Sequence, residues 1–389
     1  MPGRFTVLVI DSCGAGEMPD AAEYGDAGAN TLGNCAKAAG GLALPTLQSW
    51  GLGNLTAIAG CPRRERAVAS FGRMQEASQG KDTTTGHWEM MGIVLEKGFT
   101  TFPQGFPPDF LRKWQELSKV PGWLGNKTAS GTAILDELGE RHLATGLPIV
   151  YTSADSVFQI AAHEEKVPLA TLYAWCEAAR TVGKEYGLAR VIARPFVGPG
   201  TGAFKRTYNR HDFSQPPPKG LVLDALRESG VRTIGVGKIS DIYDGHGIAA
   251  SVHTEGNADG LAQTARILGE MDGGLLFVNL VDTDMLYGHR RDPKGYAQAM
   301  REIDQALPSI TGRMRPSDVL VITADHGNDP TYPGTDHTRE YVPVLAYAPG
   351  RSTGVDLGIR SSFCDLGATV ADYFGVRAPR GESFLGQVI

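Results

Sequence analysis

Short apolar runs, alternating with segments of helical period, dominate the chain and restrict its fold. Four of the helical segments are Leu221–Glu228, Leu261–Met271, Tyr296–Leu307 and Cys364–Phe374. The alternation predicts an α/β fold with a mostly parallel sheet. The runs that have the length and composition of buried strands are Thr6–Ile10, Pro148–Tyr151, Arg190–Ala193, Thr233–Val236, Leu275–Val281, Val319–Thr323 and Val342–Ala346.

The middle of the chain differs in character from its two ends. It is bounded by two connectors, Lys97–Pro108, rich in Gly, Pro and Phe, and His211–Lys219, which contains three consecutive prolines. Between them lie helical and strand patterns sufficient for a unit of its own. We therefore predict a core domain made of residues 1–97 and 214–389, and a smaller α/β cap domain inserted at 98–213.

Charge and composition exclude several classes of function. The formal net charge of -6 at pH 7 argues against a nucleic-acid partner, which usually selects for a basic face. No run approaches the roughly 18 apolar residues that a membrane helix needs, so no membrane partner is expected. The five cysteines are scattered without a CxxC pair. This pattern indicates free thiols in a reducing compartment. We therefore predict a cytoplasmic protein.

Acidic and imidazole side chains follow three of the predicted strands. Functional groups of an open parallel sheet gather at the carboxyl edge of its strands, so these side chains are expected to meet there. A single aspartate at a strand end is commonly only a helix cap or a turn residue. Several at successive strand ends favour a metal site. The six residues are Asp11, Asp284, His289, Asp325, His326 and His337.

The types of these six residues indicate which ions they would bind. Carboxylate oxygen together with imidazole nitrogen favours Mn²⁺ or Zn²⁺ over Ca²⁺ or Mg²⁺. Two such ions roughly 4 Å apart suit phosphoryl transfer, because they stabilise both the attacking and the leaving oxygen. We therefore predict two Mn²⁺ ions, with Zn²⁺ or another divalent cation as the alternative.

A second chemical feature is the segment GKDTTTGHWE at 80–89. It places three hydroxyls between glycines, directly before a helix-compatible run. A hydroxyl at the positive end of a helix and beside a metal is activated as a nucleophile. The structural alternative is a threonine-rich helix cap.

Taken together, these segments resemble bacterial phosphopentomutase, of the alkaline phosphatase superfamily of metalloenzymes. Besides Asp11-Ser12 and the 80–89 segment, the resemblance rests on DTDMLYGHRRDP at 282–293 and ADHGNDPTYPGTDHTREYVP at 324–343. It extends to Asp20–Asp26, Thr31-Leu32-Gly33, YTSADSVFQIAAHEE at 151–165, RVIARPFVG at 190–198 and GKISDIYDG at 237–245. It therefore covers nearly the whole chain.

The resemblance implies an alkaline-phosphatase-like core with an inserted cap. It also implies an isomerase, an intramolecular phosphotransferase that moves phosphate between C1 and C5 of ribose or 2-deoxyribose through a 1,5-bisphosphate. The phosphate carrier corresponds to Thr83, which a pentose or hexose bisphosphate activator would prime. One metal would be held by Asp284, His289 and His337. The other would be held by Asp11, Asp325 and His326.

The resemblance also points to residues that would bind the pentose phosphate. Ser153, Asp155 and Val157 are expected near the sugar. Arg194, Arg206 and Lys238 are expected to contact phosphate, since a planar guanidinium can make a two-pronged contact with phosphate oxygens.

Three other functions compete with the mutase. A metal-dependent phosphomonoesterase of the same superfamily would share the metals and the threonine, with water attacking the phosphoenzyme. A non-enzymatic metal-binding or phosphosugar-binding protein would leave the threonine nucleophile without a purpose. The cap motifs favour the mutase over the phosphatase. A phosphoglycerate mutase would normally have a serine nucleophile shortly after the first aspartate, where Ser12 lies, but the YTSAD and GKISD segments count against it.

Overall fold

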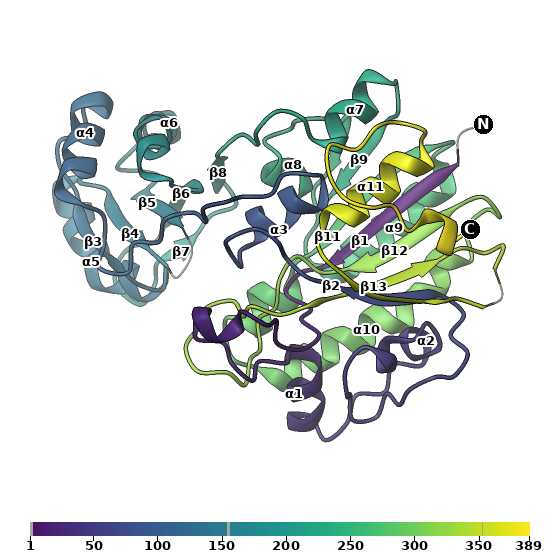
Figure 1. Cartoon of the computed structure of the whole chain (residues 1–389). Helices are drawn as coiled ribbons and strands as arrows, with labels where there is room; N and C mark the ends of the chain where they lie inside the picture. The colour runs from purple at the N-terminus through teal and green to yellow at the C-terminus, as the bar shows by residue number, and fades with distance from the viewer. Residues whose placement is uncertain (1–2, 154–155, 352) are drawn as a thin grey trace. The chain divides into compact units, whose positions relative to one another are not determined.

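The computed structural model describes residues 3–153, 156–351 and 353–389. The chain divides into two compact units, one of Met1–Gly98 with Pro217–Ile389 and the other of Phe99–Pro216. We call these the core unit and the inserted unit (Figure 1). Among the described residues, no helix combines the length and apolarity needed to cross a bilayer.

The core unit contains an eight-stranded sheet with the order β10-β9-β11-β1-β12-β13-β2-β14. The five strands from β10 to β12 run parallel, whereas β13 runs antiparallel to both of its neighbours. The predicted α/β fold class is therefore confirmed. The strands are β1 (Arg4–Ile10), β2 (Ser70–Met74), β9 (Thr233–Val236), β10 (Ala250–Val252), β11 (Gly274–Leu280), β12 (Val319–Thr323), β13 (Val342–Tyr347) and β14 (Asp356–Arg360).

Helices cover both faces of this sheet (Figure 1). On one face α10 packs against α1, α2 and α9, and on the other α11 packs against α3 and α7. The helices are α1 (Thr31–Ala38), α2 (Pro45–Ser49), α3 (Thr83–Met90), α7 (Val222–Glu228), α8 (Ile239–Ile242), α9 (Asn257–Glu270), α10 (Pro293–Thr311) and α11 (Cys364–Tyr373).

The central strands are apolar throughout because both of their faces are covered. Every residue of β1, β11 and β12 is buried. Their register places the carboxyl ends side by side, since Ile10 pairs with Leu280 and Val9 pairs with Thr323. The segments that follow these three strands therefore begin at one edge of the sheet.

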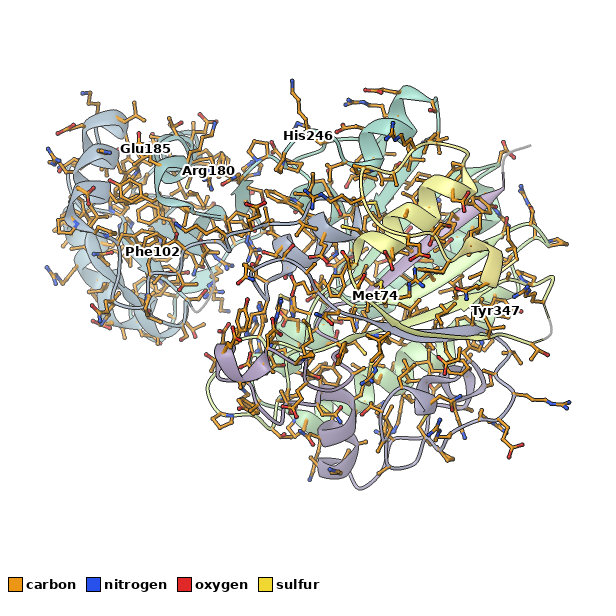
Figure 2. The ribbon with its side chains drawn as sticks, viewed as in Figure 1. Met74, Phe102, Arg180, Glu185, His246 and Tyr347 are labelled. Carbon is orange, nitrogen blue, oxygen red and sulfur yellow. The ribbon has the colours of Figure 1, made fainter. Side chains whose placement is uncertain are left out.

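The inserted unit has a sheet of its own, with the order β3-β4-β5-β6-β7 and with β8 paired to β6. Two hydrophobic clusters stabilise it, and Phe102, labelled in Figure 2, belongs to the larger one. Its elements are α4 (Pro108–Ser118), β3 (Leu124–Thr128), α5 (Ala133–Thr145), β4 (Ile149–Thr152), β5 (Val157–His163), α6 (Leu169–Gly183), β6 (Arg190–Val197), β7 (Lys205–Arg206) and β8 (His211–Ser214).

Candidate active site

Asp11 lies at the carboxyl end of β1 and is fully buried. The strand ends there because Ser12 adopts a left-handed backbone conformation, with φ of 69°. This turn directs the Ser12 N–H to Asp325 Oδ1, at 3.1 Å. Asn279 of β11 donates its Nδ2–H to Asp11 Oδ2 at 3.2 Å. Adjacent strands thus hold the two carboxylates Asp11 and Asp325 in place.

His326 stands beside this pair of carboxylates. Its Nε2 lies 3.6 Å from Asp11 Oδ1 and 3.4 Å from Asp325 Oδ2. Its Nδ1 lies 3.1 Å from the carbonyl oxygen of Gly327. A carbonyl can only accept, so the hydrogen-bond pattern assigns the proton to Nδ1 and leaves the Nε2 lone pair directed at the carboxylates.

Asp284, His289 and His337 form a second group. His289 Nε2 lies 3.1 Å from Asp284 Oδ2 and 3.2 Å from His337 Nε2. His337 Nε2 lies 3.5 Å from Asp284 Oδ1. The ring centroids of His326 and His337 are only 3.9 Å apart, so the two groups adjoin. The structure therefore brings together all six residues that the sequence singled out at strand ends.

The donor set fits divalent cations. Potential ligand atoms of Asp11, Asp325 and His326 lie within 4.8 Å of one another, and so do those of Asp284, His326 and His337. Asp11 Oδ1 and Asp325 Oδ2 are buried and have no hydrogen-bond partner among the described residues. Buried carboxylate oxygens left without a donor are costly unless a cation accompanies them.

Electrostatics around Asp11 support the same interpretation. Burial raises the pKa of Asp11 well above its usual value, and repulsion from Asp325 and Asp284 raises it further. For Asp325, burial acts to raise the pKa, but the neighbouring His326 and His87 outweigh it and lower the pKa to about 2. Asp11 is thus the member of the pair whose charge the protein alone does not compensate.

Thr83 is the first residue of α3 and points its hydroxyl at this cluster. Thr83 Oγ1 lies 3.2 Å from His326 Nε2. The preceding residue, Asp82, is the N-cap, and its Oδ1 accepts from the backbone N–H groups of Thr84 and Thr85 at 3.0 and 3.1 Å. The helix start is therefore fixed, and with it the direction of the Thr83 hydroxyl.

The three consecutive threonines have different surroundings. Thr85 Oγ1 donates to Asp82 Oδ2 at 2.6 Å, so this hydroxyl belongs to the helix cap. For Thr85, the structure therefore agrees with the structural alternative, a threonine-rich helix cap. The hydroxyl of Thr83 is the one that lies beside His326.

Gly86 allows α3 to approach Asp325 closely. A Cβ at this position would overlap the backbone carbonyl of Asp325. We expect Gly86→Ala to push the helix and Thr83 away from the cluster and to lower the free energy of unfolding by about 1–3 kcal/mol. Activity should fall with it. Chemical denaturation and a turnover assay measure the two effects.

Gly269 of α9 provides the matched control for Gly86. It is exposed, and a Cβ added there would meet only the end of the flexible Arg313 side chain, at 3.4 Å. Gly269→Ala should therefore stabilise the protein by about 0.5–1 kcal/mol. If both variants behaved alike, the close approach at Gly86 would not matter.

Two further residues of the site were not singled out from the sequence. His87 Nδ1 lies 2.9 Å from the Thr83 carbonyl oxygen and 3.3 Å from Asp325 Oδ2. Asn328 donates its Nδ2–H to Asp284 Oδ1 at 2.8 Å. His87 lies within the 80–89 segment and Asn328 shortly after the third strand end, but only tertiary contacts reveal which group each one touches.

The predicted pentose-binding residues lie mainly in the inserted unit. Ser153 follows β4, and Val157 begins β5 and is buried. Asp155 lies outside the described residues. Within the described parts of the chain, no contact of Ser153 or Val157 distinguishes a binding role from a structural one.

The two predicted arginines of the inserted unit differ in exposure. Arg194 of β6 donates its Nε–H to Gln159 Oε1 at 3.0 Å. Burial and the nearby Arg210 lower the pKa of Arg194 to about 10. Arg206 of β7 is exposed, and its guanidinium lies so close to Gly131 that a Cβ there would overlap it. Arg206 is therefore accessible to an anion at the edge of this sheet.

Lys238 belongs to the core unit. It follows β9 closely and serves as the N-cap residue of α8. Its positive charge counteracts part of the rise in the pKa of Asp11, which places it on the same side of the sheet as the carboxylate cluster. Lys238 is thus a cation of the core site, whereas Arg194 and Arg206 belong to the inserted unit.

A mostly parallel sheet with carboxylate and imidazole side chains clustered at the carboxyl ends of its strands defines a class of protein. The chain belongs to the metalloenzyme superfamily, whose family model matches residues 3–378. The PH0037 protein from Pyrococcus horikoshii shares the fold, with a TM-score of 0.51 at 13% sequence identity over 96% of this chain and 98% of that one.

Within that superfamily the chain is a member of the phosphopentomutase family. It is 60% identical to the phosphopentomutase of Anaeromyxobacter sp. (strain K) over 388 residues, which is 100% of both chains. It is 57% identical to that of Symbiobacterium thermophilum, covering 99% of this chain and 98% of the relative. The predicted family, fold class and enzyme class, an intramolecular phosphotransferase, are confirmed.

Proposed function

We propose that this enzyme interconverts the 1-phosphate and 5-phosphate of ribose or 2-deoxyribose through a phosphothreonine at Thr83. The observation that carries the mechanism is the position of the Thr83 hydroxyl, 3.2 Å from His326 Nε2, beside two adjoining groups of carboxylate and imidazole ligands. Family membership at 60% identity supports the overall reaction.

Two divalent cations, Mn²⁺ by preference, would be held by the six clustered residues. Asp11, Asp325 and His326 would hold one, and Asp284, His289 and His337 the other. When bound, such ions act as Lewis acids that neutralise charge on the transferring phosphoryl group. Zn²⁺ or another divalent cation stays the alternative, because imidazole and carboxylate also suit zinc.

The protein's own residues supply alignment. With phosphate on Thr83, a free hydroxyl of the pentose phosphate attacks phosphorus, the bond to Thr83 Oγ1 breaks, and a pentose 1,5-bisphosphate forms. In the second half of the cycle Thr83 Oγ1 attacks the other phosphate, which restores the phosphoenzyme and releases the isomer. Asp82 holds the helix start so that Thr83 Oγ1 keeps one direction in both steps.

A priming step follows from this cycle. An enzyme whose Thr83 is unmodified can only accept phosphate, so a pentose or hexose bisphosphate activator would start turnover. Thr83 would carry a phosphate after this priming step, so the enzyme would be a phosphoprotein.

The inserted unit would serve as the cap that recognises the substrate. Ser153, Asp155 and Val157 would contact the sugar, and Arg194 and Arg206 would contact the distal phosphate. Lys238 of the core unit is proposed separately as a phosphate contact. The accessible guanidinium of Arg206 supports this role. A cap that excludes water would favour transfer to the sugar over hydrolysis.

Arg206→Ala is expected to lower mutase kcat/KM by about 10–100-fold, the loss of a hydrogen-bonded contact between charged groups. It should also raise the ratio of released phosphate to isomerised product. Lys205→Ala is the matched control, because Lys205 is the adjacent exposed cation of the same short strand. An unchanged product ratio at the full mutase rate would contradict the role of Arg206.

A product analysis tests the proposed function itself. Purified enzyme is incubated with ribose 1-phosphate, Mn²⁺ and a catalytic amount of a bisphosphate, and the products are followed by phosphorus NMR. Ribose 5-phosphate as the main product supports the mutase. Inorganic phosphate as the main product would instead identify the metal-dependent phosphomonoesterase, and no reaction would contradict both.

We also propose a cytoplasmic location. The supporting observation is that Cys13, Cys35, Cys61, Cys176 and Cys364 are all buried free thiols. Free thiols are the usual state of cysteine in a reducing compartment.

A further inference from the structure

Arg291 connects two segments that leave different strands of the core sheet. It lies between the helical turn Thr283–Gly288, which follows β11, and helix α10. Its guanidinium donates hydrogen bonds to both segments. Nη1 donates to Gly288 O at 3.2 Å, Asn328 Oδ1 at 2.6 Å and Asp329 O at 3.0 Å, Nη2 donates to Asp336 O at 3.0 Å, and Nε donates to Gly334 O.

The backbone of Arg291 is held in an unfavourable conformation. Its φ is 55°, in the left-handed region that costs a residue with a side chain roughly 1 kcal/mol or more. Such a conformation persists only when the surrounding contacts determine it strongly. The five hydrogen bonds of the guanidinium are contacts of that kind.

Three of the residues that accept hydrogen bonds from Arg291 are each connected to one member of the Asp284–His289–His337 group. Asn328, whose Oδ1 accepts from Arg291, donates its Nδ2–H to Asp284 Oδ1 at 2.8 Å. Gly288 directly precedes His289. Asp336 directly precedes His337.

The orientation of His289 depends on the same loop. His289 Nδ1 lies 2.7 Å from the carbonyl oxygen of Thr335, which stands between Gly334 and Asp336. Because a carbonyl only accepts, this contact assigns the proton to Nδ1 of His289, while Nε2 faces Asp284 and His337. Arg291 holds the carbonyl groups on both sides of Thr335 and so fixes the position of this acceptor.

The first metal group has different supports. Ser12 N–H donates to Asp325 Oδ1, and Asn279 donates to Asp11 Oδ2. The hydrogen bond between His326 Nδ1 and the carbonyl oxygen of Gly327 fixes the orientation of the His326 ring. None of the hydrogen bonds found for Arg291 in the described parts of the chain reaches Asp11, Asp325 or His326.

From this arrangement we propose that Arg291 is the positioning residue for the Asp284–His289–His337 metal site, and that its loss weakens metal binding at this site while leaving the affinity of the other site unchanged. The inference rests on the two-metal site of the proposed function. Partners that orient metal ligands typically contribute about 10–100-fold to metal affinity. A lysine cannot replace this arginine, because a single ammonium cannot donate in the plane to two segments at once.

The test measures Mn²⁺ binding to the full-length protein by calorimetry and by metal analysis after gel filtration. The wild-type protein is expected to bind two ions. Arg291→Gln and Arg291→Lys should keep one at wild-type affinity and bind the second about 10–100-fold more weakly. Activity should recover when Mn²⁺ is raised by the same factor. Arg290→Gln, at the adjacent exposed arginine, should bind both ions like the wild type.

The outcomes separate this inference from the proposed function. A wild-type protein that fails to bind two ions contradicts the two-metal site itself. A wild type with two ions and a folded Arg291→Gln with the same two affinities overturns the inference, and so does an equal weakening of both ions.

Asn328→Ala keeps the inference testable if the Arg291 variants do not fold. This variant removes the contact to Asp284 and leaves the arginine in place. It too should weaken one ion and spare the other. Two unchanged affinities in folded Asn328→Ala would overturn the inference.

Discussion

Thr83→Val is expected to abolish both phosphoenzyme formation and mutase turnover. Valine keeps the shape of threonine and removes only the hydroxyl that lies 3.2 Å from His326 Nε2. Loss of a nucleophile that forms a covalent intermediate lowers turnover by at least roughly 10⁴-fold in comparable enzymes. The measurement is a steady-state assay with Mn²⁺ and bisphosphate at saturation.

The neighbouring threonines provide the controls for this result. Thr85→Val removes the hydrogen bond to Asp82 Oδ2, so it should destabilise the protein by about 1 kcal/mol while keeping the phosphoenzyme. Thr84→Val should also keep it. Loss of turnover in Thr84→Val to the level of Thr83→Val, with the fold intact, would show that the wrong hydroxyl has been selected.

Asp11→Asn is expected to separate activity from stability. The pKa of Asp11 is raised by burial and by repulsion from Asp325 and Asp284. A carboxyl whose pKa is higher in the folded protein opposes folding when it is ionised, above its unfolded pKa. The amide removes this charge and still accepts from Asn279. Metal-free Asp11→Asn should therefore be more stable than the metal-free wild type near neutral pH, and yet inactive.

Thermal unfolding with and without Mn²⁺ measures this effect. The wild-type protein should gain stability from Mn²⁺, whereas Asp11→Asn should gain markedly less. Its advantage in the metal-free state should shrink as the pH falls toward about 4, because the wild-type carboxyl is then protonated increasingly in both states. A destabilised metal-free Asp11→Asn would contradict the electrostatic account.

Asp282 offers the matched control for Asp11, because it also follows a central strand. Its carboxylate accepts from the backbone N–H of Asn257, at 2.7 Å, and takes part in no metal group of the described residues. Asp282→Asn should therefore respond to Mn²⁺ like the wild type.

The sequence predicted strands that are mainly apolar and missed several whose apolar pattern is interrupted. The expected and observed bounds of β9 and β12 coincide. β5 was not predicted because Gln159 and His163 interrupt its apolar pattern, although all seven residues are buried. β2 escaped because its sequence, SFGRM, has a half-exposed residue at alternate positions and a central glycine.

The strand-end rule explains how far the site could be predicted. Asp11 and Asp325 follow neighbouring parallel strands, so they lie at the same end of the sheet regardless of the loop conformations. The positions of the strands in the sequence are sufficient to predict this. The residues that orient the ligands act through loops that meet only in three dimensions. Arg291 and Asn328 are 37 positions apart, and nothing in their spacing indicates a contact.

The position of the phosphate on the enzyme tests the mechanism most directly. The wild-type protein is incubated with a pentose 1,5-bisphosphate and Mn²⁺, and mass spectrometry of the intact chain is followed by mapping of the peptide that spans 80–89. The account predicts one added phosphate, located on Thr83, and none on Thr83→Val. A phosphate on Thr84 or Thr85, or one that persists in Thr83→Val, would contradict it.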